Sequence, residues 1–291
     1  MKNRGGNKKM IIGFWSNFHG QTATTSNAIT AAINLSMKYN LKTLLFHNQY
    51  IKSNLESAFI SEKENKNMEN MYTFDEMGID AVAKLINSGQ LTQDNIKNYT
   101  TEVGENLSLI IGSTKREERF KEIEKQISKI VLCSGGYDVT LIDLNSGINE
   151  CSKNIILNCD LVVVNLNQNE KVLTDFFNNI PKELQKKKYM IVLGKYNPES
   201  KFTIKYIRKV FKVKNEIAAV PYNVNYLDSH NNHKVMRYFK SLNSNLNKSD
   251  EDYYFREQVN LFTNIIVQLL NIDVDLQVSE ISKKSKLFGI F

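Results

Sequence analysis

Short apolar runs rich in β-branched residues alternate along this chain with longer segments of helical periodicity, and this alternation constrains the fold more than any other feature. The run 161–164 is apolar throughout, which implies burial on both faces, as a central parallel strand requires. The pattern predicts an α/β fold with a mostly parallel central sheet flanked by helices on both faces. Seven runs are expected to be strands: Met10–Trp15, Thr43–Phe46, Leu107–Ile111, Val139–Ile142, Leu161–Leu166, Met190–Leu193 and Ile217–Val220.

The same patterns divide the chain into five segments. Residues 1–9 are expected to form a flexible basic arm, 10–243 the α/β domain, 244–252 a polar linker, 253–271 a C-terminal helix, and 272–291 a tail with a basic and apolar end. The helix is predicted because five apolar residues recur at helical spacing: Phe255, Val259, Phe262, Ile266 and Leu269.

The formal net charge of +7 arises at one end of the chain. Residues 1–55 hold 7 of the 38 basic residues and no carboxylate, so residues 56–291 balance at 31 basic against 31 acidic. This distribution lacks the general basicity of a nucleic-acid-binding coat. The sequence also shows no helix-turn-helix pattern, so DNA is not expected as a partner.

Composition excludes several other classes of protein. A hydrophobic content of 42% argues against disorder, and Cys133, Cys151 and Cys159 lack the paired spacing of a disulfide framework or a zinc site. No apolar run reaches the ~18 residues of a membrane-spanning helix, and the apolar stretch after the basic start is too short for a secretory signal. A cytoplasmic protein is therefore expected.

The first expected strand leads into a short polar loop and then a helix. The loop reads Phe-His-Gly-Gln-Thr-Ala-Thr-Thr over residues 18–25. A strand, tight loop and helix start is the geometry that binds phosphate, because free backbone N–H groups and the positive end of the helix meet at one anion. Taken alone the motif is a weak signal, since Thr and Ser are also ordinary helix caps.

Five segments in the same order resemble the ParA/MinD superfamily of deviant Walker A P-loop ATPases. Residues 18–25 align with its phosphate loop, K-G-G-x-G-K-T-T, and 43–56 with its second strand and following turn. Residues 137–147 resemble its Walker B strand and switch, and 192–198 and 219–222 resemble the two segments that flank adenine. The resemblance implies a P-loop fold, binding of ATP or ADP with Mg²⁺, and a homodimer whose subunits face each other across the phosphate loops.

The departures from the family pattern imply an atypical member with a degenerate P-loop. Ala23 replaces the lysine that contacts the β and γ phosphates, and Phe18 replaces the signature lysine that reaches the partner's nucleotide. Losing two hydrogen bonds to a charged group weakens triphosphate binding by about 3–6 kcal/mol. His47 and Gln49 replace the two aspartates of the second strand, one of which orients the attacking water in family members. Phe18 is expected to make an apolar contact between subunits, so that dimers depend less on nucleotide.

The remaining residues can still hold a nucleotide, and the resemblance assigns them roles. Thr24 and Asp143 are expected to hold Mg²⁺. Gly194 replaces the family's Asn near adenine, which leaves the base contact open. The candidate nucleotide-binding residues are Gly20, Gln21, Thr22, Ala23, Thr24, Thr25, Lys195, Pro221 and Tyr222.

The C-terminal end joins lysines to large apolar residues and is similar to the membrane-targeting tails of MinD-type proteins. On an anionic surface three lysines contribute about 3 kcal/mol. The tail either binds the inner face of the membrane or packs back on protein, and the sequence leaves both open. The candidate membrane residues are Lys283, Lys284, Lys286, Leu287, Phe288, Ile290 and Phe291.

Two functions follow from the resemblance. The degenerate loop is similar to the TadZ/CpaE branch, which implies a slow or inactive ATPase acting as a dimeric positioning scaffold at the inner membrane face for a pilus, secretion or conjugation machine. The alternative is an active ParA-type DNA partition ATPase. The missing lysine at Ala23 favours the scaffold, because a partition cycle needs hydrolysis to reset it.

Overall fold

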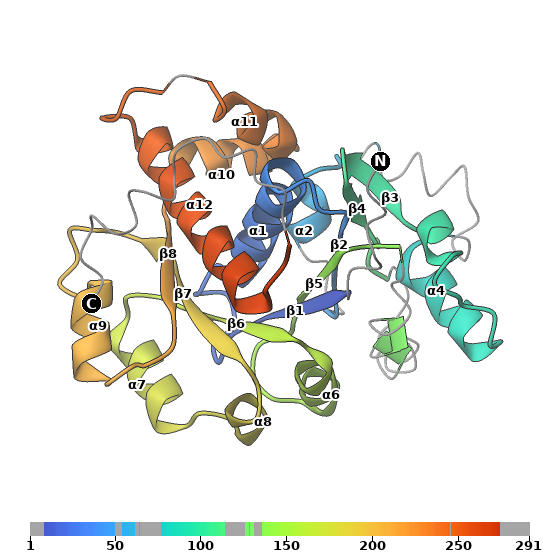
Figure 1. Ribbon diagram of the computed structural model, residues 1–291, viewed down its shortest axis with the longest axis horizontal. Coiled ribbons are helices and arrows are strands. Elements are labelled where there is room, and N and C mark those ends of the chain that lie inside the picture. The colour runs from blue at the N-terminus through green and yellow to red at the C-terminus, as the bar shows by residue number, and fades with distance from the viewer. Residues whose placement is uncertain are drawn as a thin grey trace.

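The computed structural model describes residues 9–49, 54–61, 64, 77–113, 126–127, 129–130, 136–244 and 246–273. Their strands form one sheet in the order β3-β4-β2-β5-β1-β6-β7-β8 (Figure 1). All neighbouring strands are parallel except β3 and β4. The strands are β1 (Met10–Trp15), β2 (Thr43–His47), β3 (Thr101–Gly104), β4 (Leu107–Leu109), β5 (Val139–Asp143), β6 (Leu161–Leu166), β7 (Tyr189–Tyr196) and β8 (Ile217–Pro221).

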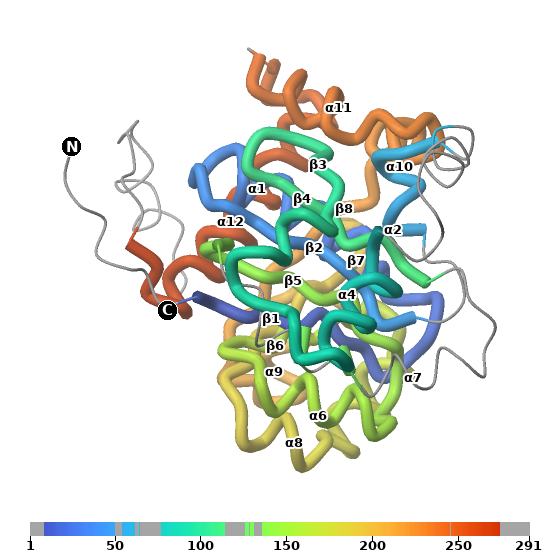
Figure 2. The backbone as a smooth tube through the Cα atoms, turned by 90° about the vertical axis from the view of Figure 1, so that its right-hand side faces the viewer, coloured from blue at the N-terminus to red at the C-terminus, as the bar shows by residue number. Residues whose placement is uncertain are grey.

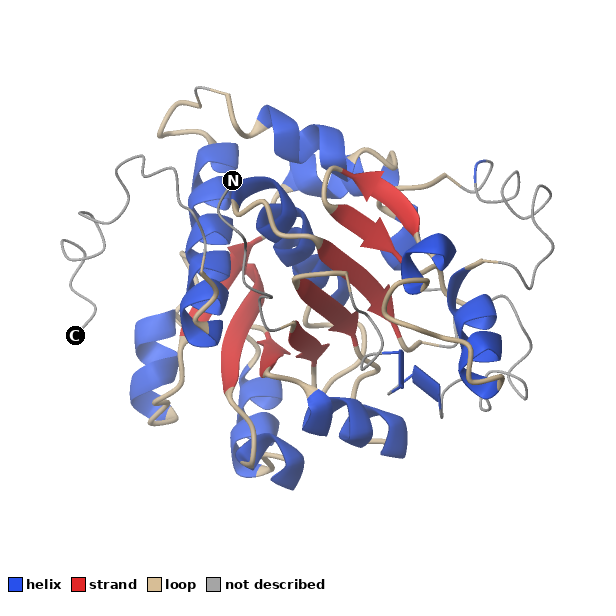
Figure 3. Ribbon diagram, turned by 45° about the vertical axis from the view of Figure 1, so that its right-hand side comes forward, coloured by secondary structure: helices blue, strands red, loops and turns tan. Residues whose placement is uncertain are grey.

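Helices cover both faces of this sheet, as Figure 3 shows. They are α1 (Thr24–Lys38), α2 (Asn54–Ser57), α4 (Gly78–Asn87), η1 (Ile96–Tyr99), α6 (Glu150–Asn158), α7 (Glu170–Asn178), α8 (Lys182–Gln185), α9 (Ile204–Val210), α10 (Val224–Asn231), α11 (Val235–Ser241) and α12 (Glu251–Leu270). The prediction of a mostly parallel sheet between two helical layers is confirmed.

Two apolar layers lie between the sheet and its helices. In one layer, side chains from one face of the sheet pack against α1, α11 and α12. In the other layer, side chains from the opposite face pack against α4, α6, α7 and α9. Adjacent residues of one strand take opposite faces, so Phe14 packs in the first layer and Trp15 in the second. This two-sided burial explains why the strands have continuous apolar sequences.

Strand β3 is the one strand in the described part of the chain that the apolar pattern did not predict. Its sequence, TEVG, is only partly buried, because β3 is the antiparallel edge strand of the sheet. A turn at Glu105 and Asn106 joins it to β4, with Asn106 in the left-handed conformation at φ 61°. Edge strands need no continuous apolar run, so hydrophobicity alone misses them.

Helix α12 packs against β8 and α1, as Figure 1 shows. It begins at Glu251, so the last two residues of the predicted 244–252 linker are helical. Glu251 and Asp252 lie in its first turn, where carboxylates interact favourably with the positive end of a helix. The division into arm, domain, linker and tail otherwise stays a prediction, since residues 1–8 and 274–291 lie outside the described residues.

The topology gathers polar loops at one edge of the sheet. Strand β1 lies between β5 and β6, with β2 on the far side of β5 (Figure 2). In parallel sheets, ligands bind beyond the carboxyl ends of the strands, where the strand order changes direction. The segments after β1, β2 and β5 therefore meet at the expected position for a site.

Candidate nucleotide site

The polar loop between β1 and α1, residues 16–23, forms the first wall of the site. Gly20 has φ 74°, and Ala23 adopts the left-handed conformation (φ 58°, ψ 33°) directly before α1. No side chain caps the start of α1, and its first turn holds no carboxylate. In contrast, an Asn side chain caps each of α6, α7 and α10. The first N–H groups of α1 are therefore free to bind an anion.

A cavity of about 650 Å³, here called the loop cavity, opens above this loop. Its walls come from the loop, the end of β2, the end of β7 and helix α10. None of the described residues that line it is an Asp or a Glu, whereas Lys195 and three histidines do line it. This lining suits an anionic ligand. Its lining includes His19, Thr22, Ala23, Gln49, Lys195 and His230.

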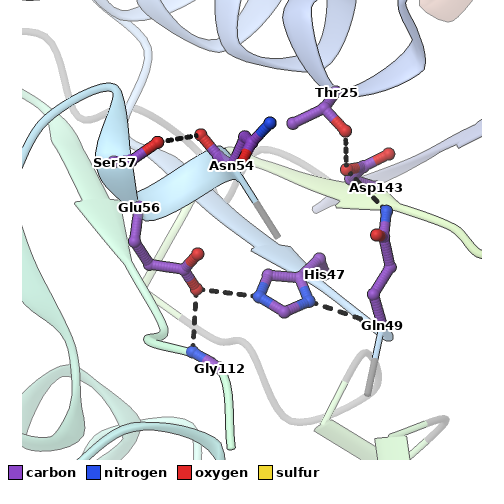
Figure 4. Close-up of polar contacts among 8 residues, drawn as sticks. All are labelled: Thr25, His47, Gln49, Asn54, Glu56, Ser57, Gly112 and Asp143. Atoms are coloured by element: carbon purple, nitrogen blue, oxygen red, sulfur yellow. Dashed lines mark hydrogen bonds and ion pairs between the residues drawn. The ribbon is translucent and has the colours of Figure 1, made fainter. Parts of the chain in front are cut away.

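Asp143 lies fully buried at the carboxyl end of β5. Its Oδ2 accepts hydrogen bonds from Thr25 Oγ1 at 2.6 Å and from Gln49 Nε2 at 3.1 Å (Figure 4). Its Oδ1 is also buried but has no hydrogen-bond partner among the described residues. Burial raises the pKa of Asp143 to about 6, although the Thr25 hydrogen bond and nearby His47 oppose the shift. An unpaired buried carboxylate oxygen is costly unless a ligand satisfies it.

His47, at the end of β2, lies beside Asp143 in the strand register. The backbone N–H of Gln49 donates to His47 Nδ1 at 3.1 Å, so Nε2 carries the proton that it shares with Glu56 Oε1 at 2.8 Å. Glu56 Oε1 also accepts from the backbone N–H of Gly112 at 2.9 Å. Figure 4 shows one chain of contacts from Thr25 through Asp143, Gln49 and His47 to Glu56.

The contact between His47 and Glu56 shifts the pKa of both groups. Burial opposes a charge on His47, but the adjacent Glu56 carboxylate raises the pKa of the imidazole above its ordinary value. Burial likewise opposes ionisation of Glu56, but His47 and the Gly112 N–H lower the pKa of this carboxyl group. Of this pair, only His47 stands at one of the two positions expected to correspond to the family's second-strand aspartates; the other position is Gln49.

Solved structures share this architecture at low sequence identity. A ParA family ATPase from Chlorobium tepidum has a TM-score of 0.68 and 16% identity, over 88% of this chain and 99% of that one. MinD from Pyrococcus horikoshii, complexed with Mg-ADP, has a TM-score of 0.65 and 15% identity, over 91% and 100%. A putative plasmid partition protein from Borrelia burgdorferi, bound to AMPPNP, has a TM-score of 0.58 and 19% identity, over 89% and 100%.

The fold is that of the ParA/MinD ATPases. No protein-family profile matches the chain, and no curated protein sequence matches it. The likeness is therefore one of structure, detected where sequence similarity is weak.

Within this ParA/MinD fold, most of the predicted loop residues line the cavity. Gly20, Thr22, Ala23, Thr24 and Thr25 do so, and Lys195 faces the same space from β7. Gln21 is exposed and is not among the lining residues; its backbone carbonyl accepts a hydrogen bond from Asn167. Pro221 and Tyr222 do not line the cavity either, and the Tyr222 side chain is 54% exposed. A base contact at these two residues stays a prediction.

The hydroxyl that contacts Asp143 belongs to Thr25 and not to Thr24. Thr24 Oγ1 instead lies 3.1 Å from Thr22 Oγ1, within the loop. The first turn of α1 thus directs its two threonines to different partners, and spacing alone does not reveal which one meets the carboxylate. The role of Thr24 as a Mg²⁺ ligand stays a prediction.

Phe18 is half-buried and packs against the apolar layer that holds α6 and α7. The ring therefore makes contacts within its own subunit, which removes apolar surface from water. The expected contact of Phe18 across a dimer remains a prediction.

The sequence did not reveal the contacts that three positions make at the site. Glu56 gave no signal, because its partner His47 and the Gly112 N–H meet it only in the fold. From the sequence, Gly194 only left the base contact open, whereas in the fold a Cβ there would clash with the Thr22 carbonyl oxygen. His230, on α10, lines the cavity without any motif around it.

The expected membrane tail lies outside the described residues, and so do Lys283, Lys284, Lys286, Leu287, Phe288, Ile290 and Phe291. Across the part of the chain that the structure describes, no helix is both long and apolar enough to cross a bilayer.

Proposed function

We propose that this chain binds a Mg²⁺–nucleotide, ATP or ADP, in the loop cavity and hydrolyses ATP slowly or not at all. The observation that carries the proposal is Asp143, whose Oδ2 accepts from Thr25 in the first turn of α1 and whose buried Oδ1 has no partner among the described residues. A carboxylate and threonine hydroxyls are the hard oxygen donors that Mg²⁺ prefers. Bound there, Mg²⁺ would neutralise phosphate charge, with Asp143 and either Thr24 or Thr25 holding the ion or its waters.

Slow hydrolysis is supported by the side chains around the cavity. Ala23 offers no cation to the transferring phosphoryl group, and His47 is engaged with Glu56. The one second-strand side chain among the described lining residues is Gln49, whose amide N–H already donates to Asp143. Stabilisation of the transition state by a positioned cation contributes about 10³–10⁵ in rate. Residual turnover would depend on Gln49.

A dimeric positioning scaffold is the role we propose for this nucleotide-binding unit. It would act at the inner membrane face for a pilus, secretion or conjugation machine, as a TadZ/CpaE-like protein, with the basic and apolar tail as the anchor. A phosphate site without the catalytic side chains supports a switch rather than a motor. Partners would recognise its nucleotide-bound or nucleotide-free state, and repeated ATP hydrolysis would not be needed.

An active partition ATPase is the second candidate. The likeness to a plasmid partition protein bound to AMPPNP favours it. Because such a motor requires hydrolysis, turnover separates the two functions, and ATP-dependent retention of DNA separates them independently.

Calorimetry of the full chain with Mg-ATP and Mg-ADP tests the nucleotide site. We expect saturable binding of both, weakened by EDTA and by Thr25→Ala, whose hydroxyl donates to Asp143. Thr24→Ala tests the alternative metal ligand. Exposed Thr92→Ala, outside the cavity, serves as the matched control. Absence of binding to the folded wild type would reject the proposal.

Phosphate release tests ATP hydrolysis, and co-sedimentation with liposomes tests the membrane anchor. Turnover faster than several per minute, or DNA retention only with ATP, would favour the partition motor. Co-sedimentation with anionic liposomes is expected for the full chain but not for a chain ending at Ser279. Equal pelleting of both chains would remove the membrane anchor.

A further inference from the structure

We propose that Lys195 supplies the phosphate-binding cation that Ala23 cannot, so that the site holds the polyphosphate group from β7 instead of from the start of α1. This inference rests on the proposed nucleotide site. It also changes the role expected for Lys195, from a neighbour of the base to a ligand of the phosphates.

The end of β7 lies directly against the phosphate loop. A Cβ added to Gly194 would come within 2.3 Å of the Thr22 carbonyl oxygen and 2.9 Å of Ala23 Cβ. Only a glycine allows this approach of two backbones, as in other tight strand–loop contacts. Lys195 directly follows Gly194 in the chain and therefore lies beside Ala23.

The backbone at Lys195 adopts a conformation that redirects its side chain. Lys195 lies at a register shift between Gly194 and Tyr196 in the pairing of β7 with β8, and its φ is 51°. Such bulges re-aim a side chain and are frequent beside functional sites. A left-handed conformation is unfavourable for any residue with a side chain, and a glycine would adopt it without strain. The lysine is exposed and lines the loop cavity.

The charges around the cavity favour an anion near Lys195. Among the described residues that line the cavity, it is the one lysine or arginine, and none is a carboxylate. Lys195 forms no ion pair with any described residue. An unpaired ammonium group on a flexible stem is well suited to contact phosphate oxygens.

The test compares Lys195→Met with Lys201→Met in the full-length protein. Methionine keeps most of the aliphatic stem and removes the charge, and Lys201 is an exposed lysine that does not line the cavity. Calorimetry measures the affinity for Mg-ATP, for inorganic tripolyphosphate and for adenosine, and circular dichroism checks that each variant is folded. We expect Lys195→Met to weaken Mg-ATP and tripolyphosphate about 10- to 100-fold and to leave adenosine unchanged. Lys201→Met should match the wild type.

The outcomes separate this inference from the function on which it rests. Wild type that binds Mg-ATP, with equal tripolyphosphate affinity in Lys195→Met, would overturn the inference and leave the nucleotide site intact. If Lys195→Met lost affinity for adenosine alone, Lys195 would contact the base and not the phosphates, and the inference would also be overturned. Wild type that binds neither Mg-ATP nor tripolyphosphate would defeat the proposed function and the inference together.

Discussion

Two parts of the site are built in opposite ways: the exposed lining of the loop cavity, here called the outer wall, and the buried network behind that lining, here called the inner wall, whose titratable residues do not themselves line the cavity. On the inner wall, Asp143 and His47 are buried and the Glu56 side chain is only 15% exposed; hydrogen bonds through Gln49 link Asp143 to His47, which in turn contacts Glu56 of α2. On the outer wall, His19 and Lys195 are exposed and held only by the course of the backbone. Buried charges depend on their partners, whereas exposed ones are solvated by water. Changes on the inner wall should therefore alter stability, and changes on the outer wall should alter binding alone.

The strongest effect is expected from breaking the buried pair. His47→Ala leaves the Glu56 carboxylate without its partner and should lower the free energy of unfolding by about 3–5 kcal/mol. Urea unfolding measures the change. Glu56→Gln is the matched control, because a neutral amide oxygen can still accept from His47 and from the Gly112 N–H. A loss below about 1 kcal/mol in His47→Ala would contradict the tight inner wall.

The packing of the loop against β7 can be tested at Gly194. Gly194→Ala places a methyl group against the Thr22 carbonyl oxygen, a backbone atom that cannot easily move aside. We expect a stability loss of about 3 kcal/mol, the upper part of the range for overpacking, and weaker Mg-ATP binding. Thermal unfolding and calorimetry follow the two effects. Wild-type thermal stability and wild-type Mg-ATP affinity in Gly194→Ala would mean that the loop does not pack against β7.

A smaller effect of opposite sign is expected at Asp143. Its folded pKa of about 6 lies above the ordinary 3.8, so its contribution to stability is present below pH 3.8 and is lost as pH rises through 6. A rise of two pKa units corresponds to about 3 kcal/mol, of which the new unpaired amide N–H of Asn cancels part. Asp143→Asn should therefore stabilise the Mg²⁺-free protein by about 1–2 kcal/mol at pH 8 and hardly at all at pH 4.

The same variant should lose the stabilisation that Mg-ATP confers on the wild type. Thermal unfolding at both pH values, with and without Mg-ATP, checks these effects together. Destabilisation of Asp143→Asn at pH 8 would show that the carboxylate is satisfied in the folded protein.

The least effect on stability is expected on the outer wall. His19→Ala removes an exposed loop side chain and should change the free energy of unfolding by no more than about 0.5 kcal/mol. Since His19 lines the cavity, any change should be in nucleotide affinity, measured by calorimetry. A stability loss comparable to that of His47→Ala would remove the contrast between the walls.

Most of the fold could be predicted from the sequence, because strand signals are local. The bounds predicted for Met10–Trp15 and Leu161–Leu166 agree with β1 and β6, whose residues are buried on both faces. The edge strand β3 was missed because one side of an edge strand is exposed and its sequence, TEVG, carries little apolar signal. The polar loop of the candidate site could be predicted because a strand, a polar loop and a helix follow one another directly.

The details of the site could not be predicted in the same way. The Thr25 hydroxyl contacts a carboxylate 118 residues later in the chain, and Gly112 meets a carboxylate 56 residues earlier. A one-residue difference at the start of α1 decides whether Thr24 or Thr25 faces Asp143, and no periodicity resolves it. The sequence left the base contact at Gly194 open and gave no sign that a Cβ at this position would clash with the Thr22 carbonyl oxygen.

By itself, the sequence determined the parallel α/β architecture, the position of the polar loop and the absence of its lysine, since these depend on residues adjacent along the chain. Only the tertiary structure decided that one Asp143 oxygen has no partner within the described part of the chain, that His47 contacts Glu56, and that Lys195 faces the cavity beside Ala23. The physical reason is that burial, partner distance and side-chain direction arise from strand order and register, which bring together residues far apart in the chain.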